Sequence, residues 1–108
     1  MGLLPEYFPD LTGFQWDAGN SEKNWLLHEV GQAEVEQAFY NRPVLVSPDS
    51  SHSQVEVRYY VLGRSNAGRT LTIVFTLRAT LVRPIIARDM SRRERRLYAE
   101  QANAEEAP

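Results

Sequence analysis

Three segments between Val55 and Arg88 alternate apolar and polar side chains, and they constrain the fold more than any other feature of the chain. The first runs from Val55 to Leu62, the second covers Leu71 to Leu77, and the third is LVRPIIAR. Alternation with a period of two predicts strands that each bury one face. The glycine-rich stretch GRSNAGR and the short link RAT separate them. We therefore expect a three-stranded antiparallel meander.

The same alternation assigns side chains to faces of the sheet. In the first strand, one face carries Val55, Val57, Tyr59 and Val61, and the other carries Glu56, Arg58 and Tyr60. Because Pro84 has no backbone N–H, we expect the third strand to lie at an edge or to be bulged there. Arg83 and Arg88 are five residues apart and would point to opposite faces of a regular strand. A bulge would bring them together.

Two helices are predicted before the strands. Asn20 or Ser21 can cap a first helix that runs to about Val30, where Gly31 ends it, and a second helix follows over residues 33–40. The helical period predicts these buried positions: Leu26, Leu27 and Val30 in the first helix, and Val35, Ala38 and Phe39 in the second.

A third helix and two short strands complete the prediction. Ser91 to Glu94 has the pattern of a capping box that begins a helix through about Ala102, while GFQW and PVLVSPD predict short strands. We expect an α+β fold with an antiparallel sheet of four to five strands, two N-terminal helices and a C-terminal helix. The chain of 108 residues fits one domain over residues 12–104, with an extended arm at 1–11 and a frayed tail at 105–108.

Charge is separated along the chain. Residues 58–96 contain ten arginines and two acids, a local net charge of +8, whereas residues 1–57 have a net charge of -7. The chain has no cysteine, which excludes disulfides and thiolate metal sites and fits a reducing compartment. The N-terminus has neither a basic leader nor a long apolar run, so we expect a cytoplasmic protein without membrane association. The histidines show no ligand spacing, so we expect no metal and no cofactor.

A series of short motifs resembles the BrnT family of type II toxins. The matching residues run in order through FQWD (14–17), Asn24, His28, Val30, His52-Ser53, Glu56, Arg58, Gly63, Gly68-Arg69, Val74-Phe75-Thr76, Arg83, Ala87-Arg88, Glu94-Arg95 and Tyr98. The resemblance implies a fold like that of RelE-type ribonucleases and cleavage of RNA that inhibits translation. It also implies neutralisation by a ribbon-helix-helix antitoxin of the BrnA type. Operator DNA would be contacted only through the complex with that antitoxin.

Metal-free RNA cleavage requires a base near the 2′-hydroxyl, an acid near the leaving 5′-oxygen and cations over the phosphorane. Arginine suits the last role because its planar fork binds two phosphate oxygens and keeps its charge. The candidate catalytic residues are His28, Arg58, Arg69, Arg83 and Arg88. His52 is either a catalytic residue or a turn residue that fixes the neighbouring backbone. Glu56 is either a base beside Arg58 or half of a structural ion pair.

RNA-binding candidates lie in the last predicted helix and in the first. They are Arg92, Arg93, Arg95 and Arg96, with Trp25 as a stacking platform. The arginine run can equally be a solvated helix face or a contact for an acidic part of the antitoxin, and we expect Trp16 to be core. Two other functions remain open: a non-catalytic RelE/ParE-like protein that binds a protein target or serves only as co-repressor, and a plain single-strand nucleic-acid binder.

Overall fold

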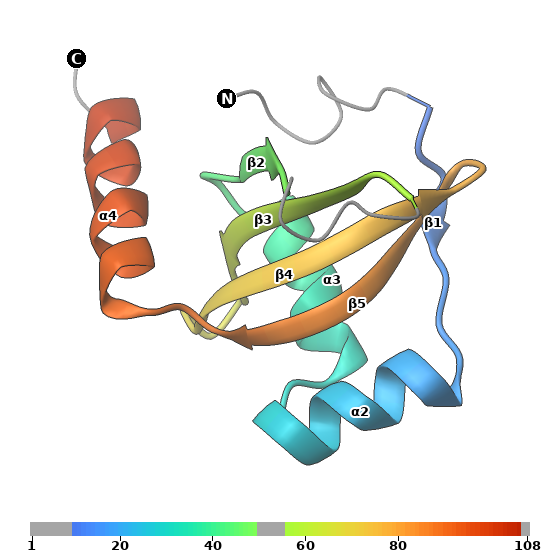
Figure 1. The fold of residues 1–108 in the computed structure, drawn as a ribbon. Helices are drawn as coiled ribbons and strands as arrows, with labels where there is room; N and C mark the ends of the chain where they lie inside the picture. The colour runs from blue at the N-terminus through green and yellow to red at the C-terminus, as the bar shows by residue number, and fades with distance from the viewer. Residues whose placement is uncertain (1–9, 50–55, 107–108) are drawn as a thin grey trace.

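The computed structural model describes residues 10–49 and 56–106 of the chain (Figure 1). His52 and most of the predicted N-terminal arm lie outside these residues, as does the start of the first predicted meander strand at Val55. Among the helices that the structure describes, none has the length and apolar character needed to cross a membrane.

Five strands form one mixed sheet in the order β1-β5-β4-β3-β2. The strands are β1 (Gly13–Phe14), β2 (Leu45–Pro48), β3 (Arg58–Arg64), β4 (Thr70–Arg78) and β5 (Leu81–Asp89). Strands β2 to β5 pair antiparallel with their neighbours, which confirms the meander. The α+β class is also confirmed. However, β1 pairs parallel with the start of β5, so the sheet is mixed rather than purely antiparallel.

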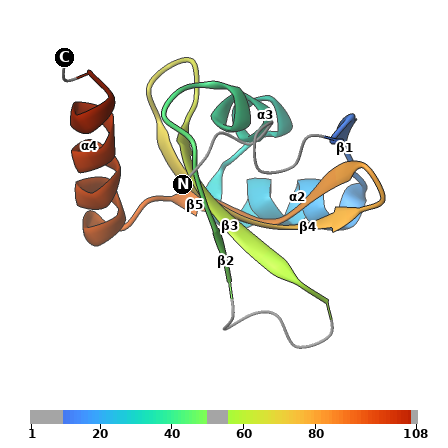
Figure 2. The same cartoon turned by 90° about the horizontal axis from the view of Figure 1, so that it is seen from above.

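Three helices accompany the sheet: α2 (Ala18–His28), α3 (Gln32–Tyr40) and α4 (Arg92–Glu106). Helices α2 and α3 lie on one side of the sheet, and α4 stands apart from both (Figures 1 and 2). The main core lies beneath α3, where Val35, Ala38 and Phe39 are buried as predicted. Trp16 packs against this core and donates a hydrogen bond from Nε1 to Glu36 at 2.7 Å.

Helix α4 packs on the opposite face of the sheet through one aromatic residue. Tyr98 is buried in a small cluster with Leu45, Leu62 and Met90. Its hydroxyl donates to the backbone carbonyl of Pro43 at 2.7 Å, so both the apolar ring and the polar tip have partners. The rest of α4 is mostly exposed. Its first turn is also tied to the end of β5, because Glu94 pairs with Arg88.

The predicted buried stripe of α2 is wrong in part. Leu26 and Leu27 are 78% and 63% exposed, although Val30 just beyond the helix is buried. The residues that α2 buries against the sheet are instead Asn20 and Asn24. Helix boundaries also differ from the prediction: Asp17 is the N-cap, and Glu29 adopts the left-handed conformation after His28. Helix α2 therefore presents polar side chains inward and leucines outward.

The edge of β5 explains this inversion. Strand β1 pairs with Leu81 and Val82, and within residues 10–49 and 56–106 no other strand pairs with the rest of that edge of β5. Asn20 donates to Pro84 O at 2.9 Å, and Asn24 accepts from Ala87 N at 2.9 Å. Two asparagines thus replace a missing strand, because buried backbone groups without partners cost free energy.

A bulge in β5 sets which side chains share a face. Val74 pairs with Ile86 and Phe75 pairs with Pro84, so Ile85 is the extra residue. Of the two alternatives predicted for Pro84, the bulge is confirmed. The prediction that placed Val57 on the buried face is wrong: Val57 precedes β3 and is 60% exposed.

Candidate functional site

Three of the candidate arginines lie on the face of the sheet opposite α2 and α3, which we call the open face. Arg58 on β3 and Arg83 on β5 both pair with Thr76 of β4, and Arg88 pairs with Thr72. Directly paired residues of a sheet point to the same side, so all three side chains share the open face. The expectation that a bulge would unite Arg83 with Arg88 is therefore confirmed.

Each open-face arginine already has a carboxylate partner. Arg83 Nη1 lies 2.9 Å from Asp17 Oδ2, and Arg58 Nη2 lies 3.9 Å from Glu56 Oε1. Arg88 makes a bidentate pair with Glu94, at 2.7 and 3.0 Å. The open face is therefore a set of ion pairs rather than a bare cationic surface.

Glu56 accepts hydrogen bonds from Arg78 as well as approaching Arg58. The hydrogen bond from Arg78 is the main reason that the pKa of Glu56 lies below its usual value. A carboxyl with a lowered pKa is a weak base near neutral pH. This arrangement favours the structural ion pair over the catalytic alternative.

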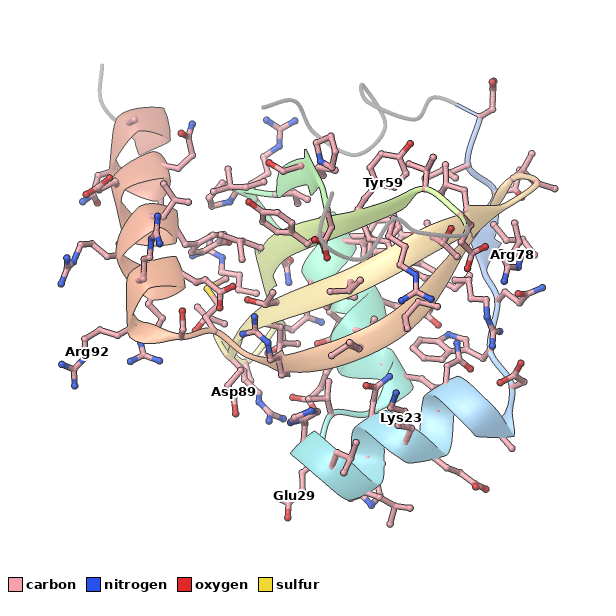
Figure 3. All side chains as sticks on the ribbon, viewed as in Figure 1. Lys23, Glu29, Tyr59, Arg78, Asp89 and Arg92 are labelled. Atoms are coloured by element: carbon pink, nitrogen blue, oxygen red, sulfur yellow. The ribbon has the colours of Figure 1, made fainter. Side chains whose placement is uncertain are left out.

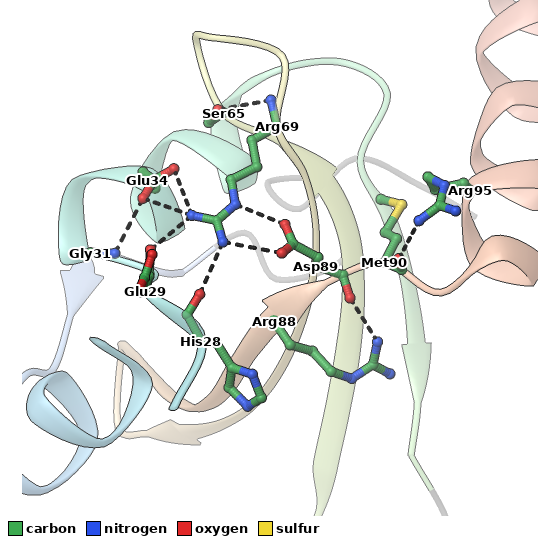
Figure 4. A network of polar contacts seen from close by, with 10 residues as sticks. All are labelled: His28, Glu29, Gly31, Glu34, Ser65, Arg69, Arg88, Asp89, Met90 and Arg95. Atoms are coloured by element: carbon green, nitrogen blue, oxygen red, sulfur yellow. Dashed lines mark hydrogen bonds and ion pairs between the residues drawn. The ribbon is translucent and has the colours of Figure 1, made fainter. Parts of the chain in front are cut away.

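Arg69 does not join the other arginines, and that expectation is wrong. Its guanidinium lies where α2, α3 and β5 meet (Figure 4). It donates to Asp89 at 2.8 Å and to Glu34 at 3.2 Å. It also donates to two backbone carbonyls, those of Glu29 at 2.8 Å and His28 at 3.0 Å. With every donor group engaged in the fold, Arg69 has the surroundings of a structural residue.

His28 occupies the last turn of α2, beside the end of β5 that carries Arg88 and Asp89 (Figure 4). It is half-buried. Hydrogen bonds from Arg69 lower the pKa of Asp89, and the charge of His28 contributes to this effect. His28 thus lies at the boundary between the Arg69 network and the open face. Trp25, one turn earlier, is 57% exposed.

A groove of about 720 Å³ separates the open face from α4. Its lining combines three arginines and three acids with one aromatic ring and apolar side chains: Arg88, Arg93, Arg96, Asp49, Glu94, Glu100, Tyr60 and Leu97 are among them. Arg92 does not line it and points from α4 away from the sheet (Figure 3). Arg95 donates to the carbonyl of Met90 at 2.8 Å.

Sequence reasoning did not single out Tyr60 and Thr72, which line this groove. Their alternation placed them on strand faces, but nothing in the pattern indicated that α4 would face them. The two arginines of α4 that line the groove, Arg93 and Arg96, make no ion pair with any residue that the structure describes. They share the groove with the acids Asp49, Glu94 and Glu100, so its lining has mixed charge.

Comparison with curated proteins gives no match. A family model described as "Ribonuclease toxin, BrnT, of type II toxin-antitoxin system" matches residues 16–94. The matched region extends from Trp16 before α2 to Glu94 in the first turn of α4, and so includes His28 and all three open-face arginines. Because the match spans well over half of the sequence, this chain belongs to the BrnT family of ribonuclease toxins of type II toxin-antitoxin systems.

Proposed function

We propose that this chain is an endoribonuclease that cleaves RNA without a metal ion. The supporting observation is the gathering of Arg58, Arg83 and Arg88 on one face of the sheet, with His28 at its edge. In the proposed reaction the 2′-oxygen loses its proton and attacks phosphorus. The bond from phosphorus to the 5′-oxygen breaks, and that oxygen takes a proton. The products are a 2′,3′-cyclic phosphate and a 5′-hydroxyl.

His28 is the group proposed to move a proton in this reaction, because imidazole titrates near neutral pH. The arginines would hold the phosphate and the charge that develops on it. Each must first exchange its carboxylate for a phosphate oxygen. Arg83 is 19% exposed and its partner Asp17 is 54% exposed, so the carboxylate side of this pair is open to solvent and to a competing phosphate.

Among the residues that the structure describes, no group of three His, Asp or Glu side chains is arranged to hold a metal ion. Metal independence is therefore a direct target for experiment. The purified protein should cleave single-stranded RNA in excess EDTA and leave 2′,3′-cyclic phosphate ends. His28→Ala should reduce the rate by about 100-fold or more, in the range of general acid–base contributions. The control is Arg42→Ala, which removes an exposed arginine that is not one of the candidate site residues.

Membership in a type II system supplies an antitoxin partner at the level of the family. We propose that this partner is a ribbon-helix-helix protein of the BrnA type. It would prevent this chain from cleaving cytoplasmic RNA and inhibiting translation. Operator DNA would be bound only by the complex of the two proteins. Co-expression with the protein encoded by the neighbouring gene, followed by sizing and operator binding, tests this. Binding of operator DNA by this chain alone would contradict it.

One observation favours a second function. Every open-face arginine is paired with a carboxylate, which is the arrangement expected of a protein that acts by contact alone, on a protein target or as co-repressor. The cleavage assay separates the two functions. Intact RNA at high protein concentration, together with normal binding of the antitoxin, would establish the non-catalytic alternative.

A further inference from the structure

The edge of β5 that faces α2 shows an interruption in its backbone hydrogen bonds. In a regular strand, every second residue directs its N–H and C=O groups to the same edge. On this edge Val82 O accepts from Gln15 N at 2.8 Å. Pro84 O, two residues on, accepts from Asn20 Nδ2 at 2.9 Å. The next carbonyl bonded to α2 is that of Ile85, only one residue on. This slip by one residue is the bulge in β5.

Two side chains of α2 bond to the backbone on either side of the slip. Asn20 donates to Pro84 O before it. Asn24 accepts from Ala87 N at 2.9 Å and donates to Ile85 O at 3.4 Å after it. A carboxamide offers a donor and an acceptor together, as the backbone of a neighbouring strand does. Both asparagines are buried, and a buried backbone group without a partner costs free energy. The bulge therefore depends on these two amides.

The bulge decides on which face of the sheet Arg88 lies. Arg83 pairs with Thr76 before the bulge. Arg88 pairs with Thr72 after it, and so lies on the open face with Arg83. In a strand without the extra residue, Arg88 would turn to the face that carries α2 and α3, because a slip by one residue reverses the direction of each side chain. The hydrogen bonds from α2 thus keep two proposed phosphate-binding arginines on one face.

The same helix carries two further groups of the proposed site. His28 lies one turn after Asn24, beside the end of β5 that carries Arg88 (Figure 4). Asp17 is the N-cap of the helix, and its Oδ2 lies 2.9 Å from Arg83 Nη1. Because α2 is attached to β5 at two points about one turn apart, the attachment also fixes where His28 lies relative to the arginines.

We propose that Asn24, together with Asn20, is a positioning residue for RNA cleavage. It holds the bulge in β5 and thereby places Arg83, Arg88 and His28 around one phosphate, without contacting the RNA itself. This rests on the proposed function, since it takes cleavage of RNA as the reaction. The role is distinct from stability, because a displacement of catalytic groups by about 1 Å lowers a rate by about 100-fold in a protein that remains folded.

Cleavage kinetics test this role at a temperature where circular dichroism shows each protein to be fully folded. Asn24→Ala should lower kcat for a short single-stranded RNA by about 10- to 100-fold and leave KM within about twofold, because misplaced groups stabilise the transition state less. The matched control is Val46→Ala, which opens a cavity in the core on β2, at the opposite edge of the sheet. It should lower the stability and leave kcat unchanged.

NMR measures the bulge without RNA. Cross-strand nuclear Overhauser effects should connect Thr72 with Arg88 in the unmodified protein and in Val46→Ala, and they should be lost in Asn24→Ala. If Asn24→Ala does not fold, Asn20→Ala takes its place, since it removes the other attachment to the bulge and leaves the bonds of Asn24 to β5. The expected changes have the same direction.

The possible results separate the positioning role from the nuclease proposal. An unchanged kcat in folded Asn24→Ala would overturn the positioning role, while cleavage by the unmodified protein would leave the nuclease proposal standing. An equal loss of kcat in Val46→Ala, or a lower kcat in Asn24→Ala with the pairing of Thr72 and Arg88 intact, would also overturn it. If the unmodified protein cleaves no RNA, the nuclease proposal fails, and the catalytic role of Asn24 fails with it.

Discussion

Polar side chains differ in their bonding between the side of the sheet that carries α2 and the side that carries α4. On the α2 side, Asn20, Asn24 and Arg69 have partners for their donor groups, and those partners are mostly backbone atoms. On the α4 side, Arg93 and Arg96 make no ion pair with the described residues, and both line the groove beside that helix. The difference indicates that the first flank maintains the fold and that the second is available for a ligand.

The largest expected effect is on the α2 flank. Asn24 is 2% exposed, and Asn24→Ala would leave Ala87 N and Ile85 O without partners. We expect the free energy of unfolding to fall by about 2–4 kcal/mol, as for a broken buried hydrogen-bond network. Urea denaturation measures this. Leu26→Ala on the exposed side of the same helix should change stability by less than about 0.5 kcal/mol.

Arg69→Ala should produce the second largest loss. It would remove hydrogen bonds to Asp89, Glu34 and the carbonyls that end α2, at a cost of about 1–3 kcal/mol. The pKa of Asp89 is lowered in the folded protein, mainly by hydrogen bonds from Arg69, so its contribution is present above the usual pKa and lost on acidification. The variant should therefore lose less stability than the unmodified protein between neutral and acidic pH. An unchanged pH dependence would exclude this role for Arg69.

The two threonines of β4 sharpen the comparison within one strand. Thr76→Val should destabilise the protein by about 1 kcal/mol, because Val57 O loses its donor. Thr72→Val should cost less, because the Thr72 hydroxyl interacts with the Glu94 carboxylate, which keeps its hydrogen bonds from Arg88 and Ser91. Thermal unfolding of both variants checks the pair. Equal losses for the two variants would contradict this difference.

A smaller effect on stability is expected from Glu94 of α4, which pairs with Arg88 of β5. Its pKa is about 2 in the folded protein, below the usual 4.5. The stabilisation is complete above about pH 4.5 and is lost as the pH falls toward 2. Glu94→Gln should flatten the acid limb of the stability profile in that window. An acid limb that matches the unmodified protein would contradict the Arg88–Glu94 pair.

Local patterns predicted the strands well and the packing of α2 poorly. Alternation predicted the strands β3 and β4, although β4 buries both of its faces from Leu71 to Thr76. The absence of an N–H at Pro84 predicted either an edge position or a bulge, and the bulge is observed. The inward face of α2 depends instead on the unpaired edge of β5, more than 60 residues away from Asn20 and Asn24 in the sequence. No helical period contains that information.

The candidate site was predictable to the same limited extent. Arg58, Arg83 and Arg88 share a face because of the strand register and the bulge in β5, and the sequence offered that bulge only as one of two alternatives at Pro84. Arg69 was misplaced because its position after the turn at Gly68 does not determine the direction of a long side chain. The groove went unpredicted because it depends on where Tyr98 attaches α4 to the sheet.

The central claim is that the open-face arginines contribute to RNA cleavage. The most direct test is the rate at which the folded Arg83→Ala variant cleaves a short single-stranded RNA. We expect a decrease of about 100- to 1,000-fold, as for the loss of one group that stabilises transition-state charge, with no change for Arg42→Ala. Equal rates for the two variants, at equal folded fractions, would contradict the account.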